Sequence, residues 1–298
     1  MNKIAYLILA HADAQHLNRL INVLEGNCDI YIHIDSKSDI EEFKQIVSTK
    51  KAFFIEDRTI VSWAGISQID ATLKLIKAAL DTGNKYSHLV LLSGSDYPIK
   101  KPEYITSFFN QQPEREFIRF IDMRESPEHY MKQIKHKWFN QPFFQIKNKY
   151  IQFFDKVIRK IADLLHFHNT WDENAIIPYY GSNWWALTPS CCELILEYLN
   201  KNKDYYLINK YTFAPDEHFF HTLIGNTVYK DKSDGLQAFE GRGTYRLANY
   251  HLIHPSLSKW YDLTDWDEIS SSDKLFLRKV NSKISKELLD KIDKVLLA

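Results

Sequence analysis

The first hundred residues alternate between short apolar runs and amphipathic stretches, and this alternation limits the folds open to the chain. Apolar runs of strand length occur at 4–10, 29–35, 52–56 and 88–94. Stretches with helical spacing lie between them, at 14–24, 38–47 and 65–83. Alternating strands and helices with short connections build a mostly parallel sheet with right-handed crossovers. We therefore predict an α/β fold in which helices flank a central, mostly parallel sheet.

Polar side chains follow three of these predicted strands, at the sheet edge where parallel sheets bind ligands. His11 follows the first strand, Asp35 ends the second, and Ser95 and Asp96 follow the fourth. An aspartate at such a place is as often a turn former or helix cap as a ligand-binding group. Because Asp35 and Asp96 share one edge, a common ligand is favoured. Neither "HID" nor "SGSD" forms an Asp-x-Asp metal motif.

The overall composition argues against several classes of protein. Lys and Arg equal Asp and Glu at 38 each, so no net charge favours nucleic acid as a partner. The sequence contains no GxGxxG, Walker or GxSxG motif, so dinucleotide, P-loop and hydrolase functions lack direct support. Aromatic residues make up 14% of the chain, a content that suits sugar rings and bases as well as an apolar core.

Cysteine content and the lengths of the apolar runs bear on the compartment. The cysteines, Cys28, Cys191 and Cys192, are odd in number and lack the spacing of metal ligands. That pattern favours a reducing compartment over a disulfide framework. The run at 4–10 is followed at once by polar residues and is interpreted as a strand rather than a secretion signal, and no run is long enough to span a bilayer. We expect a cytoplasmic protein.

The alternation lapses between residues 115 and 175, where one long amphipathic pattern at 143–167 stands out. Its basic side chains outnumber the single acid, Asp155, between residues 147 and 160. They are Lys147, Lys149, Lys156, Arg159 and Lys160. A surface helix packed on the core is the more common source of such a pattern. The alternative is a helix attracted to an anionic membrane, with peripheral contact through residues 145–167.

A charged cluster, Asp216-Glu217-His218, interrupts the aromatic and apolar stretch at 211–225. Pro215 and the two carboxylates suit the start of a helix, whose dipole favours negative charge there, and Asp216 is expected to cap it. Glu217 can then project into a cleft. Charged groups in apolar surroundings are often retained because their pKa is used. Inverting glycosyl transfer needs one carboxylate to take the proton of the acceptor hydroxyl, and Glu217 is suited to that role.

Basic side chains in the last third of the chain suit a departing nucleoside diphosphate. Fixed cations stabilise the negative charge that develops on the phosphates of such a leaving group. The candidates are Arg242, Arg246, Arg278 and Lys279. Taken singly, each is more often a solvated surface charge. A segment that folds back over the sheet edge would bring them to the ligand.

Seven segments follow one another in an order that resembles family 14 glycosyltransferases, the core-2/I-branching β-1,6-N-acetylglucosaminyltransferases and protein xylosyltransferases. The segments are ILAHADAQHLNRLI, YIHIDSKS, VSWAGISQIDATLKLIKAAL, LLSGSDYPIK, GSNWWALT, APDEHFFHTL and LFLRK. Together they span roughly residues 3–280. The resemblance implies a variant GT-A fold, a UDP-sugar donor, inversion at the anomeric carbon, and no required metal or other cofactor.

The resemblance also implies roles for the catalytic residues. Glu217 of "PDEH" matches the catalytic base of the family. Lys279 of "LFLRK" and Arg246 of "TYRLANY" match the basic pair that binds the diphosphate, and Arg242 is the alternative to Arg246.

Further residues match the binding segments of the family. His11 and Asp35 match the uridine pocket, and Ser95 and Asp96 match the donor side of that pocket. We expect the acceptor to meet side chains of the variable middle region and of the GSNWWALT segment, which are Glu125 or Glu128, Trp184 and Trp185.

The sequence departs from the animal members of the family, which carry a membrane anchor, a stem and several disulfides. We therefore expect a bacterial-type cytoplasmic enzyme that extends a polysaccharide or lipid-linked glycan. A single domain over 1–298 is predicted, with a nucleotide-binding half at 1–110 and an acceptor and catalytic half at 111–298. N-acetylglucosamine is the sugar expected first, with xylose, N-acetylgalactosamine and galactose left open.

Two other functions remain open. One is a catalytically silent carbohydrate-binding or scaffold protein, although intact Glu217, Arg246 and Lys279 favour an enzyme. The other is a metal-dependent transferase that uses "DWD" at 265–267. That tripeptide lies far beyond the predicted sheet, and we interpret it as a helix cap in a surface turn.

Overall fold

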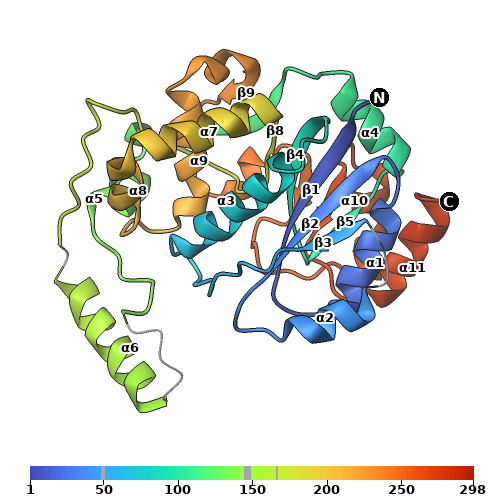
Figure 1. Ribbon diagram of the computed structural model, residues 1–298, viewed down its shortest axis with the longest axis horizontal. Coiled ribbons are helices and arrows are strands. Elements are labelled where there is room, and N and C mark those ends of the chain that lie inside the picture. The colour runs from blue at the N-terminus through green and yellow to red at the C-terminus, as the bar shows by residue number, and fades with distance from the viewer. Residues whose placement is uncertain (48–50, 144–148, 166) are drawn as a thin grey trace.

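The computed structural model describes residues 1–47, 51–143, 149–165 and 167–298 (Figure 1). Its strands are β1 Lys3–Ala10, β2 Cys28–Ile34, β3 Ala52–Phe54, β4 Tyr86–Ser93, β5 Asp96–Pro98, β6 Glu116–Asp122, β7 Tyr179–Gly181, β8 Ala186–Leu187, β9 Ser233–Leu236, β10 His251–Ile253 and β11 Phe276–Arg278. Its α-helices are α1 Ala14–Leu24, α2 Ile40–Ile46, α3 Ser67–Leu80, α4 Pro102–Asn110, α5 Lys132–Lys135, α6 Lys149–Leu164, α7 Pro189–Lys201, α8 Lys203–Asn209, α9 Phe219–Gly225, α10 Trp266–Ser271 and α11 Lys286–Val295. Short single turns are η1 Met123–Glu125, η2 Pro127–Met131, η3 Pro215–Glu217, η4 Val228–Lys232, η5 Thr244–Leu247 and η6 Leu263–Asp265.

One large sheet organises the molecule. Its strands follow the order β3-β2-β1-β4-β8-β6-β7, and β9 pairs with β6. The four strands predicted from the first hundred residues are mutually parallel. The short strand β8 runs antiparallel to both β4 and β6 and joins this half to the rest. The predicted α/β fold with a mainly parallel central sheet is confirmed.

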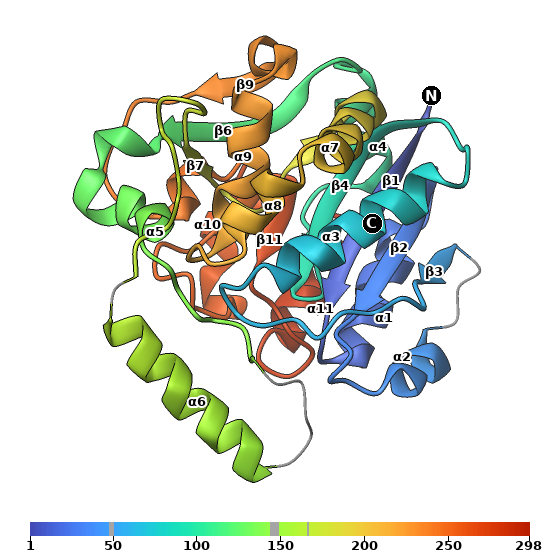
Figure 2. The same cartoon turned by 60° about the vertical axis from the view of Figure 1, so that its left-hand side comes forward.

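The central strand β1 is buried on both faces. Ile4, Tyr6 and Ile8 face a core shared with α1, α2, α4, α10 and α11. Ala5 and Leu7 face a second core shared with α3, α7, α8 and α9. Because side chains alternate along a strand, a strand between two helical layers must be apolar at every position. The two layers are visible on either side of the sheet (Figures 1 and 2).

A second, three-stranded sheet brings the end of the chain back to the large one. β11 pairs with β5 in antiparallel fashion, with Arg278 opposite Asp96, and β10 pairs with β11 in parallel. Helix α11 is fastened to α1 by Arg19, whose Nη2 lies 2.7 Å from Asp293 Oδ2. The Tyr97 hydroxyl donates to the same carboxylate at 2.6 Å. The last third of the chain therefore lies directly beside the end of β4.

The stretch between residues 115 and 175 contains structure that its sequence pattern does not indicate. Strand β6 lies there, although its charged Glu116 and Arg119 break the apolar run expected of a strand. Helix α6 confirms a helix within the predicted range 143–167, but residues 144–148 and 166 lie outside the described residues. The interpretation of this helix as packed on the core is wrong, because Phe153 is 65% exposed and the helix projects from the body (Figure 2). Among the described helices, none is long and apolar enough to cross a membrane.

Candidate active site

Glu217 lies at the end of η3, the single turn that connects α8 to α9. Ala214 precedes this turn at a φ of +47°, and its N–H donates to Ala64 O at 3.1 Å. Ala64 is itself at a φ of +54°. A non-glycine residue in this left-handed region costs roughly 1–2 kcal/mol, and such residues cluster at functional sites. The bond between the two alanines fixes η3 against the segment that leads into α3.

One hydrogen bond orients the Glu217 carboxylate. The Tyr180 hydroxyl, on β7, donates to Glu217 Oε2 at 2.7 Å. Burial raises the pKa of Glu217, the charge of Asp216 raises it further, and the Tyr180 hydrogen bond works against both. A carboxylate with a raised pKa is a stronger proton acceptor than an ordinary glutamate, as a general base requires.

Asp216 does not cap a helix, so that prediction is wrong. The backbone leaves helical geometry at His218, whose φ is −140°, and α9 begins only at Phe219 without a side-chain cap. Asp216 Oδ1 has no hydrogen-bond partner within the part of the chain that the structure describes. Burial raises the pKa of this carboxyl. Its effect on the site is electrostatic, because a second carboxyl beside Glu217 disfavours ionisation of both.

Two tyrosines whose rings are in contact connect Glu217 to the loop that precedes η5. The rings of Tyr130 and Tyr180 lie 4.0 Å apart between centroids. The Gly243 N–H donates to the Tyr130 hydroxyl at 3.0 Å. Burial raises the pKa of Tyr130, and the charge of Arg242 is close enough to oppose that rise. A continuous set of contacts therefore runs from the carboxylate to the basic loop.

The two candidate arginines of this loop are placed differently. Arg242 precedes Gly243 and acts electrostatically on Tyr130, which belongs to the contacts around Glu217. Arg246, in η5, is exposed, and its guanidinium carbon lies 5.2 Å from the centroid of the Tyr245 ring. Both arginines remain available to a ligand, but only Arg242 is adjacent to the residue, Gly243, that binds the tyrosine pair.

A second carboxylate, Asp96, has the opposite surroundings. Arg278 Nη1 donates to Asp96 Oδ1 at 2.7 Å, and His251 Nε2 lies 3.2 Å from Oδ2. Burial favours the neutral acid, but the charge of Arg278, the contact with His251 and the Ser93 N–H together lower the pKa of Asp96 below its ordinary value. The Arg278 guanidinium carbon also lies 4.0 Å from the centroid of the Trp184 ring. Since Asp96 is fully buried, it reaches a ligand only through the arginine that it holds.

Lys279 and Ser95 border this second cluster. Lys279 Nζ lies 5.9 Å from the centroid of the Trp260 ring, and burial followed by the charge of Arg278 lowers the pKa of Lys279. Ser95 O accepts from the Val280 N–H at 3.0 Å. The family resemblance favours Lys279 over its neighbour Arg278 as a diphosphate ligand. The role of Arg278 depends on the register between β11 and β5, which no local pattern reveals.

One short segment connects the two clusters. Tyr180 and Trp184 are four residues apart, so their Cα atoms are separated by at most about 14 Å. Gly181 lies between them in close packing, because an added Cβ would clash with Arg119 O and with the His221 ring. This close packing lets β7 present Tyr180 to one carboxylate while Trp184 receives the guanidinium beside the other.

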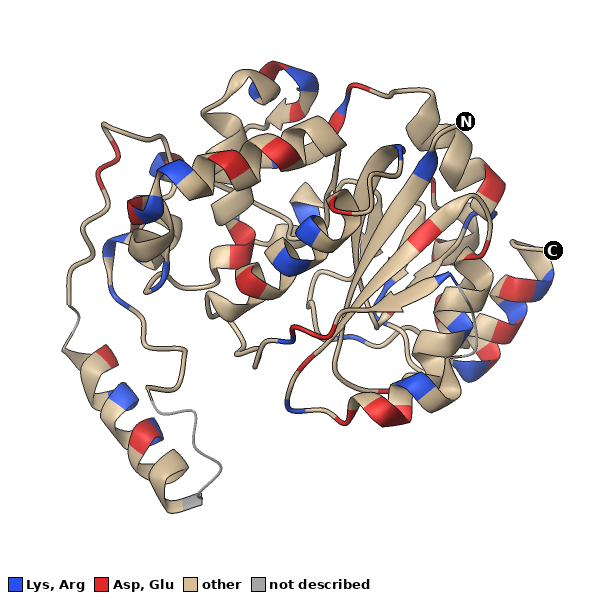
Figure 3. Cartoon of the chain, in the orientation of Figure 1, with Lys and Arg blue, Asp and Glu red and all other residues tan. Residues whose placement is uncertain are grey.

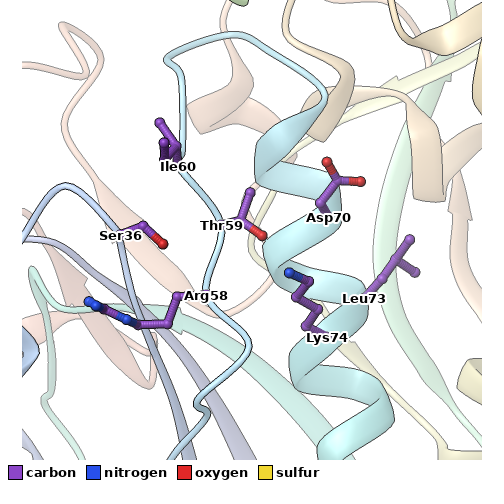
Figure 4. A pocket seen from close by; sticks show the side chains of 7 residues that line it. All are labelled: Ser36, Arg58, Thr59, Ile60, Asp70, Leu73 and Lys74. Atoms are coloured by element: carbon purple, nitrogen blue, oxygen red, sulfur yellow. The ribbon is translucent and has the colours of Figure 1, made fainter. Parts of the chain in front are cut away.

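A pocket of about 580 Å³ opens between the segment after β3 and helix α3 (Figure 4). It is lined by Ser36, Arg58, Thr59, Ile60, Asp70, Leu73 and Lys74. Asp35 lies next to it, and its Oδ1 accepts from the Lys37 N–H at 2.9 Å and the Val61 N–H at 3.3 Å. His11 is exposed, and its carbonyl accepts from Ser38 Oγ at 2.6 Å. Asp35 thus shapes the loop beside the pocket.

Comparison with known proteins decides the family. Residues 4–272 match the family model described as Core-2/I-Branching enzyme. The chain belongs to the Core-2/I-Branching enzyme family. The resemblance drawn from the seven sequence segments is thereby confirmed, and the expectation of a GT-A-like fold rests on this membership.

This family member is similar to named glycosyltransferases. It is 23% identical to a xylosyltransferase of Ciona intestinalis over 98% of this chain and 34% of that protein. It is 24% identical to mouse beta-1,3-galactosyl-O-glycosyl-glycoprotein beta-1,6-N-acetylglucosaminyltransferase 4 over 74% of this chain and 46% of that protein. The chain thus spans about a third of the length of the xylosyltransferases that it matches. The structure of mouse xyloside xylosyltransferase 1 in its apo form aligns with a TM-score of 0.38 and 10% identity, over 93% of this chain and 97% of that one.

The two acceptor glutamates predicted for this Core-2/I-Branching family member are both exposed. Glu125 ends η1, and its Oε2 accepts from the Phe239 N–H at 3.2 Å. Glu128 lies in η2, two residues before Tyr130. Both side chains therefore lie on short turns next to the tyrosine pair.

The two predicted tryptophans lie in different environments. Trp184 is 8% exposed and packs against the guanidinium of Arg278. Trp185 is fully buried, with its ring 5.2 Å from that of Phe220 in the core beneath α7 and α9. Neighbouring residues of an extended segment point to opposite sides, so only one of them faces the site. The structure assigns Trp185 to the core, not to acceptor binding.

The structure also shows where the possible metal ligands lie. Within the described residues, no group of three or more His, Cys, Asp or Glu side chains is arranged to hold a metal ion. Asp265 of "DWD" accepts from the Asp262 N–H at 3.1 Å in a capping box of η6. The same residue pairs with Lys259. The tripeptide is therefore part of a helix start, as the sequence analysis interpreted it.

Proposed function

We propose that this protein is an inverting glycosyltransferase that transfers a sugar from a UDP-sugar to a hydroxyl group of a carbohydrate acceptor. The acceptor oxygen attacks the anomeric carbon and forms the new glycosidic bond, while the bond to the diphosphate breaks and UDP leaves. Glu217 removes the proton of the attacking hydroxyl. Attack from the face opposite the leaving group inverts the anomeric configuration.

The observation that carries this proposal is the environment of Glu217. Its carboxylate is oriented by Tyr180 at 2.7 Å, and burial raises its pKa in a chain that belongs to the Core-2/I-Branching enzyme family. A hydrogen bond fixes the direction of the base, and desolvation strengthens it as a proton acceptor. The charge of the neighbouring Asp216 raises the pKa of Glu217 further.

The proposed diphosphate site uses basic side chains. Arg278 is held by Asp96 and backed by Trp184, so its guanidinium is fixed before a ligand arrives. Lys279 and either Arg242 or Arg246 would complete the positive charge on the leaving group. The uridine would lie toward His11, Asp35 and Ser95. Asp35 precedes Ser36, which lines the 580 Å³ pocket. No resident metal is required in this proposal.

N-acetylglucosamine is the donor sugar that we propose first, since one of the similar mouse proteins is an N-acetylglucosaminyltransferase. Xylose is the second candidate, because the matching xylosyltransferase of Ciona intestinalis is similar over 98% of this chain. We propose a polysaccharide or a lipid-linked glycan as the acceptor, with Trp184 and Glu125 or Glu128 in contact with it.

We also propose that the enzyme works in the cytoplasm. In support, Cys28, Cys191 and Cys192 are buried free thiols, as is usual in a reducing compartment. Cell fractionation of the native source would check this proposal, and recovery from an oxidising compartment would contradict it.

The test of this function is a thermal-shift titration with UDP, UDP-N-acetylglucosamine and UDP-xylose, each with manganese and with EDTA. Ligand at 100 times its Kd stabilises the native state by about 2.7 kcal/mol, so a specific donor gives a clear shift. We expect stabilisation that survives EDTA and weakens in Arg278→Ala and Lys279→Ala, while the exposed control Lys201→Ala leaves it unchanged. Stabilisation only with manganese would contradict the metal-free site, and no response to any nucleotide would favour a carbohydrate-binding scaffold.

A further inference from the structure

Helix α6 is joined to the rest of the molecule through its polar side. The Phe143 N–H donates to Asp155 Oδ1 at 2.7 Å, and the Phe139 N–H donates to Asp163 Oδ1 at 2.9 Å. Arg159 binds Asp155 at 2.7 Å and Phe139 O at 3.1 Å. Residues four apart share one face of a helix, so these three charged side chains all point toward the preceding segment.

The other side of α6 is apolar and exposed. Phe153 is 65% exposed, Phe154 is 64% exposed and Leu164 is 75% exposed. Ile158, Ile161 and Leu165 continue the same face at spacings of three and four residues and are also exposed. Single exposed apolar residues are ordinary, but a contiguous row of this size marks an interaction surface. We call these six residues the outer face of α6.

The charges around the outer face are positive. Lys156 and Lys160 are exposed and lie one turn apart beside it. Both carboxylates within α6, Asp155 and Asp163, are engaged on the opposite side. Charged residues colour only part of the helix in Figure 3. The outward surface therefore combines large apolar side chains with lysines and presents no carboxylate of this helix.

We infer that α6 is a membrane-binding helix that lies in the interface of a bilayer with anionic headgroups. The outer face enters the boundary between headgroups and acyl chains, and Lys156 and Lys160 bind lipid phosphates. Protein–protein interfaces are depleted in lysine, whereas a helix that lies in a membrane interface is enriched in it. The inference goes beyond the proposed transfer reaction, and its readout is independent of catalysis.

The experiment is co-sedimentation of the full-length protein with vesicles of phosphatidylcholine alone and of an equimolar mixture with phosphatidylglycerol. We expect binding to the anionic vesicles that weakens as salt is added. Phe154→Ser combined with Ile161→Ser should weaken that binding by about 100-fold or more. Lys156→Gln combined with Lys160→Gln should weaken it by about 30-fold.

The matched control is Val228→Ser combined with Leu236→Ser, since these side chains are 74% and 48% exposed but lie outside α6. Binding of this control should equal that of the wild type. Absence of binding to anionic vesicles, or equal loss in the control, would overturn the inference. So would a wild-type dimer that the Phe154→Ser and Ile161→Ser changes dissociate without any vesicle binding, because the outer face would then belong to a second copy.

Discussion

Glu217 and Asp96 are the carboxylates of the two clusters in the candidate site, and their surroundings move their pKa values in opposite directions. Burial by itself acts to raise the pKa of both carboxyls. Asp96 has a cation, Arg278, as its partner, and its pKa ends below the ordinary value. Glu217 has another acid and a neutral tyrosine, and its pKa ends above the ordinary value. For carboxyls removed from water, the sign of the nearest charge decides whether the pKa ends above or below its ordinary value.

This contrast separates two tasks. A carboxylate that stays ionised at every working pH can hold an arginine in place, as Asp96 does. A carboxylate that binds a proton within reach of neutral pH can act as a base, as we propose for Glu217. We therefore expect Glu217 to govern turnover and Asp96 to govern stability.

Removing the base should have the largest effect on activity. In Glu217→Gln we expect transfer from the UDP-sugar to fall by about 10²- to 10⁴-fold, because an amide cannot accept the proton. Donor affinity should be retained. UDP release and donor titration measure the two quantities, and the exposed Glu197→Gln serves as the control. Wild-type turnover in Glu217→Gln would remove Glu217 from the mechanism.

Removing the structural carboxylate should have the largest effect on stability. Asp96→Asn leaves the buried side of Arg278 without its counter-ion, so we expect the free energy of unfolding to fall by about 3 kcal/mol in urea titrations. Asp57→Asn is the matched control, since its ion pair with Lys74 is exposed and worth about 1 kcal/mol or less.

The difference in the free energy of unfolding between Asp96→Asn and the wild type should depend on pH with a definite sign. The pKa of Asp96 is lower in the folded state than in the unfolded state. Its contribution to the free energy of unfolding is therefore present above the unfolded-state pKa and is lost as the pH falls through the folded-state pKa. The gap between Asp96→Asn and the wild type should therefore narrow in acid. A gap that widens below about pH 4 would contradict the ion pair as its cause.

The neighbours of Glu217 should shift the pH profile of the reaction. kcat/KM should rise with pH as Glu217 ionises, with a midpoint above 4.5. Tyr180→Phe removes a hydrogen bond to the charged form and should move this midpoint up by roughly one pH unit. Asp216→Asn removes a like charge and should move it down by a similar amount. Identical midpoints in the two variants would refute the electrostatic account.

The smallest effect expected is a gain of stability in Glu217→Gln. A carboxyl whose folded pKa is raised destabilises the native state as the pH rises from the unfolded to the folded pKa. Glu217→Gln should therefore be more stable than the wild type near pH 8 by about 1 kcal/mol or more, with little difference near pH 4. Thermal unfolding at both pH values measures this, and a difference independent of pH would contradict the raised pKa.

The sequence predicts the parallel half of the fold because its strands are apolar on both faces and alternate with amphipathic helices. It does not predict β6, whose charged residues mask its strand pattern, or the two-to-four-residue strands β7 to β11, which are too short for periodicity. At the site, Glu217 is identified by its chemistry and by family resemblance. Tyr180 and Arg278 are missed as partners, because their contacts join residues 37 and 182 positions apart.

The central claim is that Glu217 is held with a raised pKa, ready to act as a base. A direct measurement is a pH titration of the protein with carbon-13-labelled glutamate side chains, in which Glu217→Gln identifies the signal. The account predicts that the missing carboxyl resonance titrates well above the ordinary value of 4.5 and moves higher in Tyr180→Phe. Titration at or below 4.5, unchanged by Tyr180→Phe, would contradict it.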